Sequence, residues 1–147
     1  MNDKVIMLIE DNPDDEALTL RALKRNNIQN AIVIARDGQE ALDYLLGTGA
    51  DSWPRNAMIH LVLLDLNLPK LSGLDVLRRL RADARTRSLP IVVLTSSNEE
   101  RDLIESYDLG ANSYVRKPVD FEQFAEAVRQ LAVYWLVLNE RPTARGA

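Results

Sequence analysis

HLVLLDLNLP, at residues 60–69, is the stretch that decides the fold. Its first six residues are almost wholly apolar and end in Asp65, and the residues that follow have the composition of a turn. A strand of this kind has no polar face, so both of its faces are buried. Such strands occur in parallel sheets that carry helices on each side. The stretch therefore predicts an α/β protein with a parallel sheet.

The sequence on either side of this strand continues the same alternation. Short apolar runs predict four more strands, at residues 4–10, 31–35, 91–95 and 113–116. Helical spacing predicts a helix after each strand, and right-handed crossovers then favour a doubly wound sheet with five strands and five helices. Capping patterns mark four helix starts: Asn12 with Pro13, Asp37 with Glu40, Asn98, and Asp120 with Gln123. The third helix is predicted over residues 73–82.

Length and composition exclude several classes of protein. The 147 residues suit one compact domain, predicted over residues 1–140 and followed by a disordered tail over 141–147. The chain has no cysteine, which excludes disulfides and thiolate metal sites. A net charge of -4 disfavours a nucleic-acid-binding surface. No apolar run is long enough for a membrane span or a signal peptide, so we expect a cytoplasmic protein without membrane attachment.

Functional groups of doubly wound sheets lie at the carboxyl ends of the strands. The predicted strand ends carry Glu10, Asp11, Asp65, Thr95 and Lys117. Crowded carboxylates repel one another unless a cation joins them, and an all-oxygen ligand set suits Mg²⁺. Asp65 is then a candidate nucleophile toward a phosphoryl group, and Lys117 and the metal would neutralise its charge.

Each of these residues also has an ordinary structural role. Asp11 is compatible with a helix cap, and Asp65 with a residue that opens a turn. Thr95 is a common residue at the end of a strand, and Lys117 a common residue on a surface. Their joint placement at one sheet edge is what favours a functional site.

At these residues the sequence resembles the receiver domain of two-component response regulators. The resemblance covers about residues 4–138 and rests on four pieces in order: Glu10-Asp11, LVLLDLNLP around Asp65, LTS at Thr95 and YVRKP around Lys117. It implies a flavodoxin-like receiver fold with strand order 2-1-3-4-5. Glu10 departs from the more usual Asp, which leaves the metal geometry open.

The resemblance also implies a role for each matching residue. Asp65 would accept a phosphoryl group from the phosphohistidine of a sensor histidine kinase, with Lys117 pairing with that group or with the Asp65 carboxylate. Thr95 would move toward the phosphoryl group, and Tyr114 would change rotamer in step with it. The implied Mg²⁺ ligands are Asp11, Asp65, the backbone carbonyl of Asn67 and, through a water, Glu10.

The end of the chain predicts a second function. Residues 131–138 (LAVYWLVL) are all apolar or aromatic, and a helix that is apolar all round must be buried all round. Either the long loop at residues 48–59, with Trp53, covers it, or it forms a homodimer that Leu136→Glu would weaken. This loop and the extended end also resemble single-domain regulators paired with phytochrome-type histidine kinases. With no output domain expected, such a protein would signal through protein contacts.

Two other functions use similar residues. A haloacid-dehalogenase-like phosphatase also has a nucleophilic Asp, but it carries an acid two residues later, where this chain has Asn67. A flavodoxin-like flavin carrier would bind phosphate after its first strand, where this chain has the acidic segment 10–15. We therefore expect a phosphoacceptor with slow self-dephosphorylation rather than a turnover enzyme.

Overall fold

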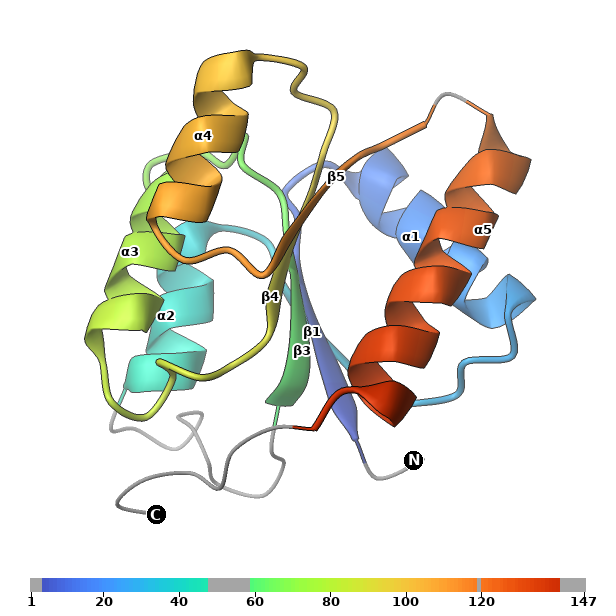
Figure 1. Cartoon of the computed structure of the whole chain (residues 1–147), viewed down its shortest axis with the longest axis horizontal. Helices are drawn as coiled ribbons and strands as arrows, with labels where there is room; N and C mark the ends of the chain where they lie inside the picture. Colours follow the sequence, from blue (N-terminus) through green and yellow to red (C-terminus); the bar gives the residue numbers. More distant parts are fainter. Residues whose placement is uncertain (1–3, 48–58, 119, 141–147) are drawn as a thin grey trace.

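The computed structural model describes residues 4–47, 59–118 and 120–140. They form a five-stranded sheet of order β2-β1-β3-β4-β5, in which all neighbouring strands are parallel, so the predicted fold is confirmed. Helices α1 and α5 cover one face, and α2, α3 and α4 cover the other (Figure 1). In chain order the elements are β1 (Val5–Ile9), α1 (Pro13–Arg25), β2 (Ile32–Ala35), α2 (Gly38–Leu46), β3 (Ile59–Leu64), α3 (Gly73–Ala82), β4 (Ile91–Thr95), α4 (Glu100–Asp108), β5 (Ser113–Arg116), α5 (Phe121–Val133) and a π-helical turn, η1 (Tyr134–Leu138).

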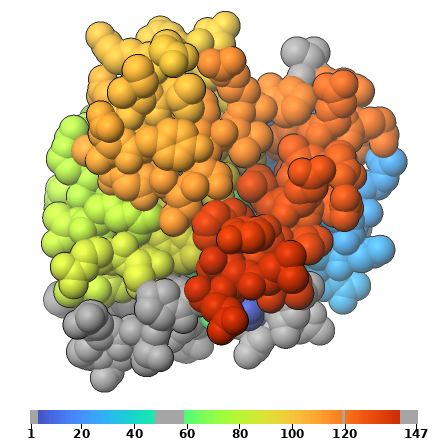
Figure 2. All heavy atoms as spheres, in the orientation of Figure 1, coloured from blue at the N-terminus to red at the C-terminus, as the bar shows by residue number. Residues whose placement is uncertain are grey.

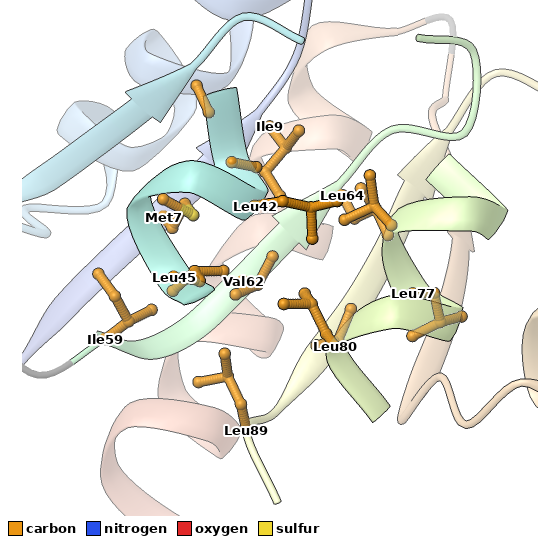
Figure 3. Packing of buried hydrophobic residues seen from close by; sticks show 14 of the residues in the cluster. Met7, Ile9, Leu42, Leu45, Ile59, Val62, Leu64, Leu77, Leu80 and Leu89 are labelled. Carbon is orange, nitrogen blue, oxygen red and sulfur yellow. The ribbon is translucent and has the colours of Figure 1, made fainter. Parts of the chain in front are cut away.

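Apolar side chains are packed on both faces of the sheet. Met7, Val62 and Leu64 project toward α2 and α3, where they meet Leu45 and Leu77 (Figure 3). Alternate residues of the same strands project toward α1 and α5, as the side-chain period of a strand requires. Every residue of β1 and β4 is buried, whereas the edge strands β2 and β5 are mostly half-buried. The predicted burial of the central strands on both faces is confirmed.

Helix starts follow the predicted caps with one exception. The side chains of Asn12, Asp37 and Asp120 accept hydrogen bonds from the first turns of α1, α2 and α5. The predicted cap Asn98 is wrong, because α4 begins one residue later with Glu99 as its N-cap. The Ser97 hydroxyl oxygen accepts a hydrogen bond from the Glu99 N–H at 3.3 Å, a contact of the kind expected from the cap.

The apolar end of the chain is buried on one side only. Leu136 is 1% exposed, whereas Val137 and Leu138 are 53% and 64% exposed. Lys4, the residue before β1, donates to the Leu136 carbonyl of η1 at 2.6 Å. The predicted packing of one side is therefore confirmed, and the cover predicted for the other side stays a prediction. Leu136→Glu is also the wrong dimer probe, because Leu136 packs into the chain's own core.

Two predictions concern segments outside the described residues. The loop at residues 48–58, with Trp53, and the tail at 141–147 lie outside the described residues. Among the helices that are described, none combines the length and hydropathy needed to cross a membrane.

Candidate functional site

Three carboxylates meet at the carboxyl edge of the sheet, the upper edge in Figure 1. Glu10 and Asp11 follow β1, and Asp65 follows β3, its neighbour in the sheet. One carboxylate oxygen from each lies within 4.8 Å of the others. The structure thus brings together the three acids that the sequence placed at one edge.

Asp65 is held in a buried position by backbone contacts. Its N–H donates to the Ile9 carbonyl at 3.1 Å, and Gly73 N–H donates to the Leu66 carbonyl at 3.0 Å. A Cβ added at Gly73 would lie 2.5 Å from the Asp65 carbonyl oxygen, so only glycine lets α3 approach this closely. Asp65 is 6% exposed, and its Oδ1 has no hydrogen-bond partner in the described part of the chain. A buried carboxylate oxygen without a partner is costly and indicates a ligand site.

Lys117 lies among these acids with its side chain 8% exposed. Its ammonium is 2.7 Å from Glu10 Oε1 and 3.3 Å from Asp15 Oδ2. The expected pairing with Asp65 is not an ion pair of the described residues, because Glu10 and Asp15 take the ammonium instead. Burial acts to lower the pKa of Lys117, but the hydrogen bond to Glu10 and the charge of Asp65 outweigh it and raise that pKa. The amine therefore stays protonated.

Glu10 has the most perturbed acidity in the site. Burial raises its pKa to about 7; the hydrogen bond from Lys117 opposes this rise, and the charge of Asp65 adds to it. Glu10 is also held by the backbone, because Asn12 N–H donates to its Oε2 at 3.3 Å. A carboxyl group with a raised pKa releases its proton when it binds a cation.

A cavity of about 430 Å³ opens beside Asp11 and Asp65, two of the three acids. Its polar walls come from the β1–α1, β3–α3 and β4–α4 connections. The lining residues are Asp11, Asn12, Pro13, Asp15, Asp65, Asn67 and Ser96. Carboxylate oxygens, one of them buried and unpaired, form the donor set that a hard divalent cation requires, so the residues present fit such an ion.

Thr95 and Tyr114 lie on neighbouring strands, and both contact Ser97. Thr95 is fully buried, and its Oγ1 accepts a hydrogen bond from Ser97 N–H at 3.3 Å. The Tyr114 hydroxyl donates to the Ser97 carbonyl at 3.3 Å. The Ser97 hydroxyl in turn donates to Asp102 of α4 at 2.6 Å. The two predicted switch residues are therefore connected to α4 through one serine.

Sequence reasoning missed two participants in the site. The sequence does not single out Asp15, because acids are common in the first turn of a helix. It does not single out Asp102, because the contact of Asp102 with Ser97 depends on where α4 begins. Helical spacing gave a usable signal for Asp15, since N-cap Asn12 sets its place in the first turn beside the acidic pair.

The sequence matches the response regulator receiver domain family over residues 6–129. It is 41% identical over 140 residues to the probable methanogenesis regulatory protein FilR2 of Methanothrix harundinacea, covering 94% of this chain and 87% of that protein. It is 36% identical over 141 residues to response regulator Rcp1 of Synechocystis sp., covering 96% of this chain and 95% of that protein.

Solved structures agree with these relatives. The phosphorylated cyanobacterial phytochrome response regulator RcpA matches with a TM-score of 0.86 at 36% identity, over 95% of this chain and 99% of that one. The Mn²⁺-bound form of Rcp1 matches with a TM-score of 0.83 at 35% identity, over 95% and 99%. The bacteriophytochrome response regulator AtBRR matches with a TM-score of 0.72 at 50% identity, over 93% and 98%. The chain belongs to the response regulator receiver domain family of two-component signalling proteins.

Proposed function

We propose that Asp65 is the phosphoacceptor of this receiver domain. The observation that carries the proposal is its buried Oδ1, which has no partner among the described residues, in a residue that lines the cavity and lies close to two other carboxylates. In the transfer, an Asp65 oxygen attacks phosphorus and the bond from phosphorus to the donor nitrogen breaks. Lys117 would supply a positive charge next to the phosphoryl group, and to do so its ammonium must move away from Glu10 or Asp15.

The cation we propose for this site is Mg²⁺. Asp11, Asp65 and the Asn67 carbonyl would hold it directly, and Glu10 would act through a water. When bound it neutralises charge on the transferred phosphoryl oxygens. Support comes from the oxygen-only donor set and from the Mn²⁺-bound form of the relative Rcp1.

Thr95 and Tyr114 are the proposed output switch. Movement of the Thr95 hydroxyl toward a phosphoryl oxygen would break its contact with Ser97 N–H. Because the carbonyl of the same serine accepts the hydrogen bond from the Tyr114 hydroxyl, movement of Ser97 would then take this acceptor away from Tyr114. The β4–α4 connection would thus change shape and expose a different surface to a partner.

The proposed donor is a sensor histidine kinase of the phytochrome type, and the proposed compartment is the cytoplasm. Support for the phytochrome link comes from the names of RcpA and AtBRR, whose chains are covered almost in full. Phosphotransfer from a purified kinase of this type should be faster than transfer from an unrelated histidine kinase. Equal rates from both would contradict the link.

Incubation with acetyl phosphate and Mg²⁺, followed by intact mass, tests the acceptor. One phosphoryl adduct should form, and Asp65→Asn or a chelator should abolish it. Asp37→Asn, an acid that caps α2, is the matched control and should leave the adduct unchanged. An adduct that persists in Asp65→Asn would overturn the proposal. Sustained turnover of a generic phosphoester would instead indicate a phosphatase, which Asn67 argues against.

The end of the chain is the proposed homodimer surface. Val133, Tyr134, Val137 and Leu138 are the exposed apolar residues of this segment. The end of α5 and η1, coloured red, lie on the face seen in Figure 2. Four large exposed apolar groups within six residues form the kind of patch that association covers.

Sedimentation at micromolar concentration tests this dimer. Val137→Glu should shift the wild-type dimer toward monomer, because the side chain is 53% exposed and its replacement leaves the core intact. Ile104→Glu is the matched control, since Ile104 is 52% exposed on α4. A wild-type protein that sediments as a monomer would remove the proposal, and a stronger effect of Ile104→Glu would move the interface to α4.

A further inference from the structure

Lys117 has two carboxylate partners, and only one of them belongs to the acidic group of Glu10, Asp11 and Asp65. The second is Asp15, whose Oδ2 lies 3.3 Å from the ammonium. Asp15 stands in the first turn of α1, where its N–H donates to the side chain of N-cap Asn12 at 3.1 Å. Its backbone is therefore fixed, and its carboxylate reaches the lysine from the helix side of the cavity.

Asp15 also lines the cavity that contains Asp65 and Asn67. Its side chain is 37% exposed, in contrast to 2% for Glu10, so it is the accessible partner of Lys117. A group entering this cavity toward Asp65 would thus meet Asp15 on the wall and find the ammonium already paired. The cap of α1 fixes the backbone of Asp15, and its carboxylate contacts Lys117.

We propose that Asp15 is a positioning residue that competes with the phosphoryl group for Lys117 and thereby shortens the life of the phosphorylated state. The inference rests on the proposed function, because it takes Asp65 as the acceptor. Two effects of Asp15 have the same direction. It draws the ammonium toward α1, and its own negative charge disfavours a phosphoryl dianion in the same cavity.

Two chemical steps form and remove the phosphoryl group on Asp65. Acetyl phosphate gives its phosphoryl group to an Asp65 oxygen, and acetate leaves as the bond from phosphorus to its oxygen breaks. Loss of the group occurs when a water oxygen bonds phosphorus and the bond from phosphorus to Asp65 oxygen breaks. Inorganic phosphate and a proton are released, and the Asp65 carboxylate is restored. Asp15 does not form or break a bond in either step.

The experiment compares Asp15→Asn with Asp14→Asn. Asp14 is the adjacent acid in the same helix turn, is exposed and forms no ion pair with Lys117 among the described residues. Both variants remove one negative charge near the start of α1. Beryllium fluoride with Mg²⁺, a mimic of the phosphoryl group, is titrated by calorimetry, and the lifetime of the acetyl-phosphate adduct is followed by intact mass.

Asp15→Asn should bind beryllium fluoride about three- to tenfold more tightly than wild type and lose its adduct more slowly by a similar factor. Asp14→Asn should have the same affinity for beryllium fluoride and the same adduct lifetime as wild type. The values for Asp15→Glu should be closer to those of wild type than the values for Asp15→Asn. Equal values for Asp15→Asn and Asp14→Asn, or weaker binding by Asp15→Asn, would overturn the inference. A wild type that forms no adduct would overturn the proposed function instead.

A second comparison tests the route through the lysine. In a Lys117→Gln background, replacing Asp15 by Asn should change beryllium fluoride binding by a smaller factor than in wild type. An equal factor in both backgrounds would show that Asp15 acts by repulsion alone and would overturn its role as a competitor for Lys117.

Discussion

At the amino edge of the sheet, long polar side chains cap backbone groups, whereas at the carboxyl edge charged side chains face one another. Lys4 donates to the Leu136 carbonyl, and Arg81 donates to the carbonyls of Leu89 and Gly110. The contacts with Leu136 and Gly110 join segments that are 132 and 29 residues apart in sequence. At the opposite edge Asp65 keeps a buried oxygen for which the described residues offer no partner. One edge stabilises the fold, and the other keeps unsatisfied groups available for a ligand.

This difference has a physical basis. A buried donor that meets a carbonyl lowers the free energy of the folded chain, whereas like charges in a buried group raise it. Proteins commonly accept such a cost where a ligand will later satisfy the groups. Substitutions at the amino edge should therefore reduce stability and spare the chemistry. Those at the carboxyl edge should change the chemistry, with smaller or opposite effects on stability.

Arg81→Ala should have the largest effect on stability. The guanidinium donates to the Gly110 carbonyl at 2.9 Å, to the Leu89 carbonyl at 2.7 Å and to Asn112 Oδ1 at 2.7 Å. Its loss removes the donor of the part-buried Leu89 and Gly110 carbonyls, whereas Asn112 Oδ1 still accepts from Ile91 N–H. The free energy of unfolding should fall by about 3 to 4 kcal/mol. Urea denaturation measures the fall, and phosphorylation at 10 °C should still yield one adduct.

Arg79→Ala is the control, because Arg79 is an exposed residue of the same helix. It should change the free energy of unfolding by less than about 0.5 kcal/mol. If the two substitutions lowered the free energy of unfolding equally, the stability of the amino edge would not depend on Arg81. Loss of the adduct in folded Arg81→Ala would contradict the division between the two edges.

Glu10 should make stability depend on pH in a way opposite to most carboxylates. Its pKa is raised from an ordinary 4.5 to about 7, so the folded chain holds the proton more tightly than the unfolded chain. Its stabilising contribution is present below pH 4.5 and is lost as the pH rises through about 7. Without metal, stability relative to Glu10→Gln should fall by about 3 kcal/mol at most across this window.

Denaturation at several pH values in the presence of a chelator measures this difference. Glu140→Gln, at an exposed residue, supplies the baseline. Added Mg²⁺ should reduce the difference above pH 7, because the proposed ion would offset the charge of the three acids. A difference between wild type and Glu10→Gln that stays flat from pH 4.5 to 7.5 would show that the buried carboxylate is not destabilised.

The fold could be predicted from the sequence because its signals are local and repeated. The run at residues 60–65 predicted a strand buried on both faces, and β3 has this burial with one half-buried residue. The strand ends then placed Glu10, Asp11 and Asp65 at one edge, and the structure brings them within 4.8 Å. Parallel strands make this inference possible, since their carboxyl ends share an edge.

The partners of Lys117 could not be predicted in the same way. Which acid the ammonium meets depends on side-chain reach and helix placement, and the long side chain of Glu10 with Asp15 of α1 takes it in place of Asp65. Which side of the last turn faces the core could not be predicted for a related reason. Composition shows that residues 131–138 are apolar, but only the path of α5 decides that Leu136 faces the core and Val137 does not.

Gly73→Ala should change stability less than Arg81→Ala and Glu10→Gln do. Its effect on the site should be the most selective of the three. The added Cβ would lie 2.5 Å from the Asp65 carbonyl oxygen and 2.6 Å from Leu66 Cα, so α3 must shift away from the end of β3. Overpacking of this kind costs about 2 kcal/mol. Because the clash is with Asp65 itself, the rate of adduct formation should fall by at least about tenfold.

Gly38→Ala separates crowding from displacement of the acceptor. Its Cβ would lie 2.8 Å from Val76 Cγ2 and 2.9 Å from the Leu71 carbonyl oxygen, on the α2 side and away from Asp65. The two alanines should therefore cost similar stability, while only Gly73→Ala slows phosphorylation. Equal rates in both variants would mean that the acceptor tolerates movement of the strand end. In that case the reactivity of Asp65 would depend on the charges around it rather than on its fixed position, and Lys117 with its two carboxylates would be the decisive part of the site.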